Sequence, residues 1–394
     1  MTGTRNLNRD GSFGDLNSDV WGYPIRSERV SLFHGLWTFD IPQSMWLVYE
    51  DDTEIVPASV TGVASTNGAG VLDTGAGGAG TFSSVLLTSK RHPRYQPNRG
   101  HHFATALLCP DAGNDGTAEW GLFTDNAGTI EDGAFFRLEA DGTLSAVVVS
   151  NGVEVYDQAI DTSGITGFDV TKGNLYDLRW QWRGVGDYFW YINLQLVHKT
   201  SLLGSRTGLS IRNPAMPVSY KVTNTTEDQS LVIGCVDVTS EAGSVDREQY
   251  SSYSATASTG GVGEVPILSI YNPPTISSRR NTRDIRLQRV TVSSAARILA
   301  TVYKTRDPAA LTGEVFTGIG GGSYVEYDTT ASAVVPANAT KITAFRVEAN
   351  GSSFVDNPDV NRIDFYVTHG DYIIVTAQGS NTTVDVTIEW GEEI

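Results

Sequence analysis

The stretch of residues 174–199 constrains the fold more than any other part of this sequence. Apolar and polar residues alternate on both sides of a glycine-containing turn, Gly184–Asp187. A period of two sends neighbouring side chains to opposite faces of a sheet, and glycine permits the positive φ angles of tight hairpin turns. The stretch therefore predicts a β-hairpin whose second strand runs from Tyr188 to Val197.

Three tryptophans of this hairpin share one set of alternating positions. Trp180 and Trp182 precede the turn, and Trp190 follows it. Large aromatic side chains on one face of a sheet pack across strands and against a second sheet. We expect all three to lie in a hydrophobic core rather than on a ligand-binding surface.

Short alternating segments recur along most of the chain. Between residues 117 and 200 they are separated by Asp-Gly and Asn-Gly pairs, and eight further strand-like segments follow residue 265. Such pairs between alternating segments are strong hairpin signals. A chain of 394 residues is also too long for one core. The sequence therefore predicts an all-β protein with two sandwiches. The expected parts are an extended arm over 1–30, a first sandwich over 31–243, a linker over 244–264 and a second, smaller sandwich over 265–394.

Charge and cysteine content narrow the choice of partners. The formal net charge of −17 argues against nucleic acid as a partner. Cys109 and Cys235 both stand in apolar surroundings, so we expect buried free thiols rather than a disulfide. We find neither a membrane-spanning apolar run nor a signal peptide, and expect synthesis in a cytoplasm.

No catalytic, cofactor or metal motif is recognised in the sequence. Sandwich glycosidases carry closely spaced carboxylates on one strand, but the nearest match here, Glu139 with Asp141, lacks a third carboxylate and stands at a turn. His101 and His102 are adjacent, so a strand would direct them to opposite faces. The oxygen-bearing residues considered for calcium do not follow a calcium-loop spacing, so turn formation is the expected role of Asp111, Asn114, Asp115, Asp125 and Asn126. The expectations are no enzyme activity, no cofactor and no metal.

Two groups of residues are candidate assembly contacts. The polar arm carries two aromatic residues, Trp21 and Tyr23, which have nothing nearby in the sequence to bury them. Arginines gather at the start of the second sandwich, at Arg279, Arg280 and Arg283. An acidic neighbouring subunit could bind them, although a charged, solvated strand edge is an equal alternative. Together with the many strand edges, these features predict a homo-oligomer, with a trimer favoured.

Three segments resemble a family of tailed-bacteriophage virion structural proteins with a lectin-like, concanavalin-like jelly roll: Ser31–Gly35, Arg94–Gly100 and Gln181–Tyr188. The resemblance extends over most of the chain. It implies a jelly-roll first sandwich and a multi-copy virion component, such as a capsid decoration protein, a head fibre or a tail or baseplate appendage. Other virion proteins would then be its partners. A glycan-binding module for host-surface adhesion is the alternative function, and a polysaccharide-degrading enzyme is a third.

Overall fold

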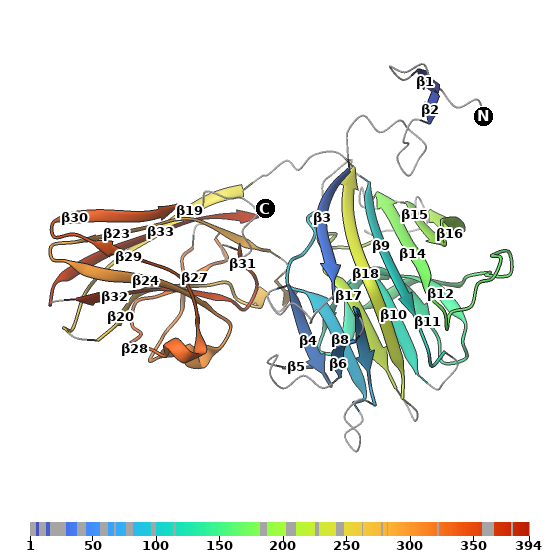
Figure 1. The fold of residues 1–394 in the computed structure, drawn as a ribbon, viewed down its shortest axis with the longest axis horizontal. Coiled ribbons are helices and arrows are strands. Elements are labelled where there is room, and N and C mark those ends of the chain that lie inside the picture. Colours follow the sequence, from blue (N-terminus) through green and yellow to red (C-terminus); the bar gives the residue numbers. More distant parts are fainter. Residues whose placement is uncertain are drawn as a thin grey trace. The chain divides into compact units, whose positions relative to one another are not determined.

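The computed structural model describes most of the chain, which divides into two compact units, Met1–Val245 and Asp246–Ile394 (Figure 1). The described residues are 5–7, 13–15, 29–37, 45–55, 62–66, 68–75, 82–95, 100–112, 116–181, 187–201, 210–224, 228–241, 248–261, 263–276, 279–281, 283–320, 323–356, 366–379 and 381–393. Each unit is described by itself.

The N-terminal unit consists of two large antiparallel sheets. Sheet I contains, in spatial order, β13 (Val153–Ala159), β12 (Leu144–Ser150), β11 (Thr129–Leu138), β10 (Thr117–Asn126), β17 (Val218–Thr223), β8 (Ser84–Ser89), β4 (Trp46–Glu50) and β5 (Thr53–Ile55). Sheet II contains β16 (Gln195–Ser201), β15 (Asp187–Ile192), β14 (Asn174–Gln181), β9 (His101–Leu108), β18 (Ser230–Glu241), β7 (Ala69–Asp73) and β6 (Val63–Thr66), with β3 (Arg29–Leu36) also paired to β18.

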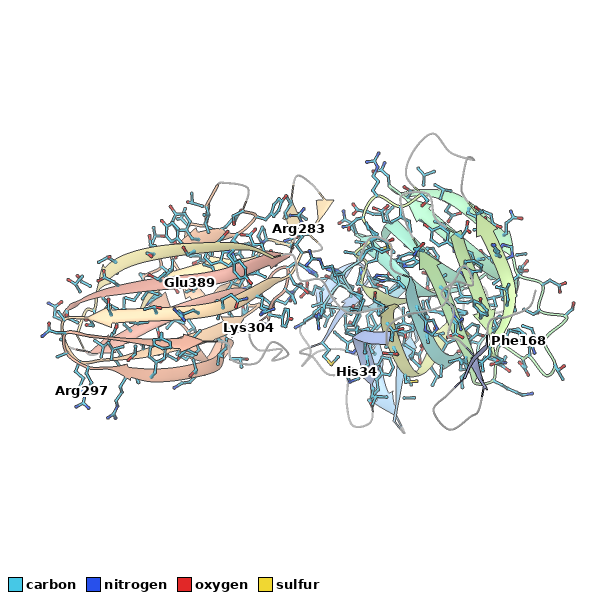
Figure 2. All side chains as sticks on the ribbon, turned by 90° about the horizontal axis from the view of Figure 1, so that it is seen from above. His34, Phe168, Arg283, Arg297, Lys304 and Glu389 are labelled. Carbon is cyan, nitrogen blue, oxygen red and sulfur yellow. The ribbon has the colours of Figure 1, made fainter. Side chains whose placement is uncertain are left out.

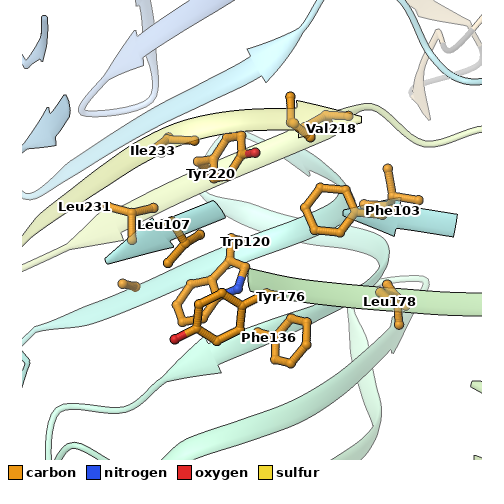
Figure 3. Close-up of a cluster of buried hydrophobic side chains, with 14 of the residues drawn as sticks. Phe103, Leu107, Trp120, Phe136, Tyr176, Leu178, Val218, Tyr220, Leu231 and Ile233 are labelled. Atoms are coloured by element: carbon orange, nitrogen blue, oxygen red, sulfur yellow. The ribbon is translucent and has the colours of Figure 1, made fainter. Parts of the chain in front are cut away.

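The two sheets enclose one hydrophobic core (Figure 3). Trp120 of sheet I meets Tyr176 of sheet II edge to face, with ring centroids 5.0 Å apart. Trp180 and Trp190 are 1% and 0% exposed, so the prediction that they are core residues is confirmed. Trp182 lies outside the described residues. The alternation of apolar and polar residues therefore directs apolar side chains from both sheets into the shared core.

The predicted hairpin forms, but its second strand is shorter than expected. β14 pairs with β15, with Trp180 opposite Tyr188. β15 ends at Ile192 rather than at Val197. Asn193 and Leu194 both have positive φ, of 49° and 68°, and β16 then turns back along β15. Two successive positive φ angles are those of a two-residue hairpin turn, which the unbroken alternation of the sequence conceals.

The C-terminal unit is a second, smaller sandwich. Sheet III contains β19 (Glu248–Ser258), β33 (Thr383–Glu393), β23 (Ile285–Ser294) and β30 (Gly351–Asp356), with β31 (Tyr366–Val367) also paired to β23. Sheet IV contains β26 (Thr317–Gly318), β27 (Glu326–Asp328), β20 (Val265–Tyr271), β32 (Tyr372–Gly379), β24 (Ile298–Thr305) and β29 (Thr340–Val347). Short elements complete it: β21 (Thr275–Ile276) with β22 (Arg279–Arg280), β25 (Leu311–Thr312) with β28 (Ala333–Val334), and the 3-10 turns η2 (Pro308–Ala310) and η3 (Pro336–Asn338).

The predicted linker over 244–264 is wrong for most of its length. Residues 248–258 form β19, which pairs with β33 over its whole length. Tyr253, Ala255 and Ala257 share one face of this strand and pack against the core of the C-terminal unit. The sequence of this segment predicts a linker because its small and hydroxylated residues give only a weak apolar alternation. These residues nevertheless form a strand once a partner strand supplies the backbone hydrogen bonds.

The all-β fold class, with a jelly-roll sandwich followed by a smaller sandwich, is confirmed. In the predicted arm, β1 (Arg5–Leu7) and β2 (Phe13–Asp15) pair as a small sheet, which the absence of a strand pattern there did not indicate. Most of the arm lies outside the described residues. Within the part of the chain that is described, no helix is long and apolar enough to cross a membrane.

Candidate functional site

A buried charged network lies on the outer face of sheet I. In β10, Trp120 and Leu122 face the core, so alternation places Glu119 and Phe123 on the opposite face. Glu119 is directly opposite Arg137 of β11 and, on its other side, opposite Lys221 of β17. A carboxylate with 6% exposure therefore stands between two strands that each present a cation.

Arg137 is the centre of this network. Its Nε lies 2.8 Å from the Oε1 of Glu119, and its Nη2 lies 2.7 Å from the Oε1 of Glu154 on β13. Glu139 and Asp157 approach its Nη1 at 3.8 and 3.7 Å. The side chains of Glu119 and Arg137 are 8% and 14% exposed, whereas that of Glu154 is 46% exposed. We call these five residues the Arg137 network; it runs from a buried carboxylate to a solvent-accessible one.

Burial and neighbouring charges shift the pKa values of this network in opposite directions. Burial raises the pKa of the Glu119 carboxyl group, and the nearby Arg137 and Lys221 only partly counter it. Burial also raises the pKa of Glu139, again against the effect of Arg137. Desolvation opposes the positive charge of Arg137, but Glu119 and Glu154 outweigh it and raise the arginine pKa. Arg137 therefore keeps its charge, whereas burial disfavours the ionised form of Glu119.

A second ion pair lies on the same face of sheet I, near the tip of the β10–β11 hairpin. The Nζ of Lys221 lies 2.7 Å from the Oδ2 of Asp125 and donates to the Gly128 carbonyl at 3.0 Å. Gly128 has a φ of 83°, and a Cβ atom added there would lie 2.7 Å from the Oδ2 of Asp52. The tip of the β10–β11 hairpin thus lies against the β4–β5 turn. An apolar cluster on this face has its members buried: Leu86, Phe123, Phe135, Val147 and Val149.

The arrangement places charged hydrogen-bond donors and acceptors together on one face of sheet I. The guanidinium carbon of Arg137 lies 5.5 Å from the centroid of the Phe135 ring, which is itself fully buried.

Most of this network cannot be recognised in the sequence. Glu139 and Asp141 do belong to a turn, in which the Asp141 carboxylate accepts a hydrogen bond from the Thr143 N–H at 2.8 Å. Hydrogen bonds from Thr143 lower the pKa of Asp141. The Glu139 carboxylate instead turns toward Arg137. The available signal was a carboxylate, Glu119, directly before the apolar run of this strand, with an arginine on the next strand-like segment.

Of the predicted assembly residues, only Arg283 has a described side chain. Trp21 and Tyr23 are outside the described residues. Arg279 and Arg280 form β22, and their side chains are also outside the described residues. The guanidinium of Arg283, marked in Figure 2, lies 4.2 Å from the centroid of the Tyr324 ring. The role of all five in assembly stays a prediction.

The histidines and cysteines are arranged largely as expected. His101 stacks on Tyr95 with ring centroids 5.0 Å apart, and burial lowers its pKa to about 3. His102 lies on the other face of β9, with its Nε2 2.8 Å from the Oδ1 of Asp177. Cys109 is a buried free thiol, as predicted, but Cys235 is only partly buried, because it lies next to a register shift in β18.

The residues considered for calcium have other partners where they are described. Asp125 binds Lys221, Asn126 donates to Glu131 at 2.9 Å, and Asp111 accepts a hydrogen bond from the Ser230 hydroxyl. Asn114 and Asp115 lie outside the described residues. Among the residues that are described, no group of three or more metal-binding side chains comes together.

No protein-family model matches the chain, and no curated protein sequence is significantly similar to it. Among solved structures, the chain is similar to an endo-1,3-β-glucanase from Streptomyces sioyaensis, with 12% identity, a TM-score of 0.42 and coverage of 55% of this chain and 98% of that one. A Bacillus licheniformis β-glucanase has 12% identity, a TM-score of 0.36 and coverage of 52% and 96%. A pseudo β-1,3-glucanase of Mycobacterium tuberculosis has 13% identity, a TM-score of 0.38 and coverage of 53% and 98%.

These comparisons contradict the expectation that the protein is not an enzyme. Four of the similar solved structures are named as two glucanases, an endo-acting O-glycanase and a glycosidic hydrolase. We therefore withdraw that expectation. Identities of 12–13% concern the fold alone, so no catalytic residue is assigned to this chain from them.

Proposed function

We propose that the N-terminal jelly roll binds a carbohydrate at the Arg137 network. The observation that carries the proposal is the single guanidinium of Arg137, which holds a buried carboxylate, Glu119, and a half-exposed one, Glu154. Sugar hydroxyl groups donate to carboxylates and accept from guanidinium groups. If the protein is also a component of a bacteriophage virion, the ligand would be a glycan of the host surface.

The test measures binding of the full-length protein to a panel of neutral polysaccharides. Glu154→Gln keeps the shape of a half-exposed side chain but removes its charge. A hydrogen bond to a charged group contributes about 1.5–3 kcal/mol, so we expect binding to weaken about tenfold or more. The matched control is Glu348→Gln in the C-terminal unit, because Glu348 is also an exposed glutamate paired with an arginine, Arg297, at 3.2 Å.

Three outcomes are informative. Loss of binding in Glu154→Gln, with the control unchanged, supports the proposal. Unchanged binding in both variants, or no binding of any neutral polysaccharide by the wild-type protein, would contradict it. New reducing ends released by the wild type and lost in Glu119→Gln would extend the proposal from binding to hydrolysis.

A second candidate function is structural, as a component of a bacteriophage virion. Its support is the sequence resemblance together with apolar side chains exposed on the C-terminal unit. Tyr250 on β19 and Phe354 on β30 are 72% and 60% exposed, and these strands are the two ends of the main strand order of sheet III. Exposed apolar residues on edge strands favour contacts with neighbouring subunits.

In this second proposal, copies of the chain assemble as a homo-oligomer with other virion proteins. Trp21, Tyr23, Arg279, Arg280 and Arg283 remain the proposed contacts, and the trimer remains the proposed state. Deletion of residues 1–30, followed by measurement of occupancy on assembled particles, tests the arm. Full occupancy of the truncated protein would show that the arm is not the anchor.

A further inference from the structure

The outer face of sheet II carries a second group of polar residues, separate from the Arg137 network. In β14, Leu178 and Trp180 face the core, so Asp177, Arg179 and Gln181 share the opposite face. Four other strands of sheet II continue this face. Arg179 is opposite His102 of β9 and Phe189 of β15, His102 is opposite Thr239 of β18, and Phe189 is opposite Lys199 of β16.

Several polar atoms of this face are buried and have no hydrogen-bond partner in the described part of the chain. Asp177 is 2% exposed; its Oδ1 contacts His102, but its Oδ2 has no partner. Gln181 is also 2% exposed, and its Oε1 has no partner. The Nε atom of Arg179 and the Oγ1 atom of Thr239 are also buried and also have no hydrogen-bond partner. Buried polar atoms without partners are costly and uncommon in folded proteins, so their concentration on one strand face indicates a binding site.

Two cations on this face are held by aromatic rings rather than by carboxylates. The guanidinium carbon of Arg179 lies 4.3 Å from the centroid of the Tyr191 ring, and the Nζ of Lys199 lies 4.8 Å from the centroid of the Phe189 ring. A ring face fixes the position of a cation without using its hydrogen-bond donors. The contrast with Arg137, whose guanidinium binds four carboxylates, shows that Arg179 retains donors for a ligand.

The mixture of donors and acceptors defines the ligand. Arg179 and Lys199 require an anionic acceptor, whereas the Oδ2 of Asp177 and the Oε1 of Gln181 require donors. A sugar acid supplies both, since its carboxylate pairs with the cations and its hydroxyl groups donate to the acceptors. We infer that this face binds a carboxylate-bearing polysaccharide, with Arg179 contacting the sugar carboxylate and Asp177 a neighbouring hydroxyl group. This site is independent of the carbohydrate site proposed at Arg137.

The experiment compares two polymers that differ only in charge. Polygalacturonate carries free carboxylates, and its fully methyl-esterified form does not. The full-length wild-type protein is expected to bind polygalacturonate at least tenfold more tightly than the ester, with an affinity that falls as salt rises. Arg179→Gln is expected to abolish this preference, and Lys199→Gln, an exposed position that does not support the fold, is expected to reduce it.

The control variant is Arg297→Gln, because Arg297 is an exposed arginine of the C-terminal unit, marked in Figure 2. It should leave the preference unchanged. Equal binding of the two polymers by the wild-type protein, or a preference that survives both Arg179→Gln and Lys199→Gln, would overturn the inference. This result can be distinguished from the result at the Arg137 network. Glu154→Gln should weaken the binding of neutral polysaccharides and leave the preference for the charged polymer intact.

Discussion

Glu119 and Arg137 stand directly opposite each other on β10 and β11, and the Oε1 of Glu119 lies 2.8 Å from the Nε of Arg137. The pair lies on the outer face of a sheet, yet both side chains are largely buried. Only Arg137 reaches on to Glu154, which meets solvent. This one guanidinium therefore links the stability of sheet I to the candidate ligand site.

The first prediction concerns the loss of that guanidinium. Arg137→Met removes the arginine that forms an ion pair with the buried Glu119. Breaking a buried ion pair by removing one partner costs about 3–5 kcal/mol. We expect a decrease of this size in the free energy of unfolding of the N-terminal unit at neutral pH, measured by urea denaturation. Arg297→Met, at an exposed position, should change it by less than about 0.5 kcal/mol.

The second prediction is the pH dependence of this loss. Burial raises the pKa of Glu119 in the folded protein. A carboxyl group with a raised pKa favours the folded state below its unfolded pKa, and this contribution is lost as pH rises through the folded pKa. Because Arg137 lowers the pKa of Glu119, removing it raises that pKa further. The destabilisation by Arg137→Met should therefore be smaller near pH 5 than near pH 8. Equal destabilisation at both values would rule out a buried carboxylate as its cause.

The core of the fold follows from the sequence, but the candidate site does not. Alternation around Trp180 and Trp190 is a local property, and it predicts both strands and buried faces. The Arg137 network instead depends on which strands become neighbours, because Glu154 reaches Arg137 only after β12 and β13 have paired in register. Glu119 alone resembles an ordinary surface carboxylate in the sequence. Long-range register, rather than residue type, creates its environment.

The third prediction tests the core. Trp190 is fully buried, and its Nε1 donates to the carbonyl of Phe135 in the facing sheet at 3.2 Å. Trp190→Ala should decrease the free energy of unfolding by about 3–5 kcal/mol, as deletions of large aromatic side chains from cores do. Tyr250→Ala, at a 72% exposed position, is the matched aromatic control and should have little effect. A similar effect of both substitutions would show that Trp190 does not stabilise the fold through its burial.

The fourth prediction concerns the two thiols. Cys109 is buried, and its pKa is raised by burial and by the nearby Asp111, whereas Cys235 is partly exposed. The thiolate is the reactive form of cysteine. We expect iodoacetamide to modify Cys235 in the folded protein and Cys109 only after denaturation, as measured by mass spectrometry of peptides. Modification of Cys109 at a comparable rate under native conditions would contradict the described packing around it.

The last prediction uses the turn between β15 and β16. Leu194 has a φ of 68° and is 71% exposed, so its side chain contributes little packing while its backbone is in a left-handed conformation. Left-handed backbone costs residues other than glycine about 1–2 kcal/mol, and glycine after asparagine is the preferred pair for such a turn. Leu194→Gly should therefore increase the free energy of unfolding by about 1 kcal/mol, less the cost of the more flexible unfolded chain. Leu196→Gly is the matched control, because Leu196 is 52% exposed within β16, where glycine weakens a strand. Stabilisation by the first substitution and destabilisation by the second, measured by denaturant unfolding, would confirm the turn, and destabilisation by both would exclude it.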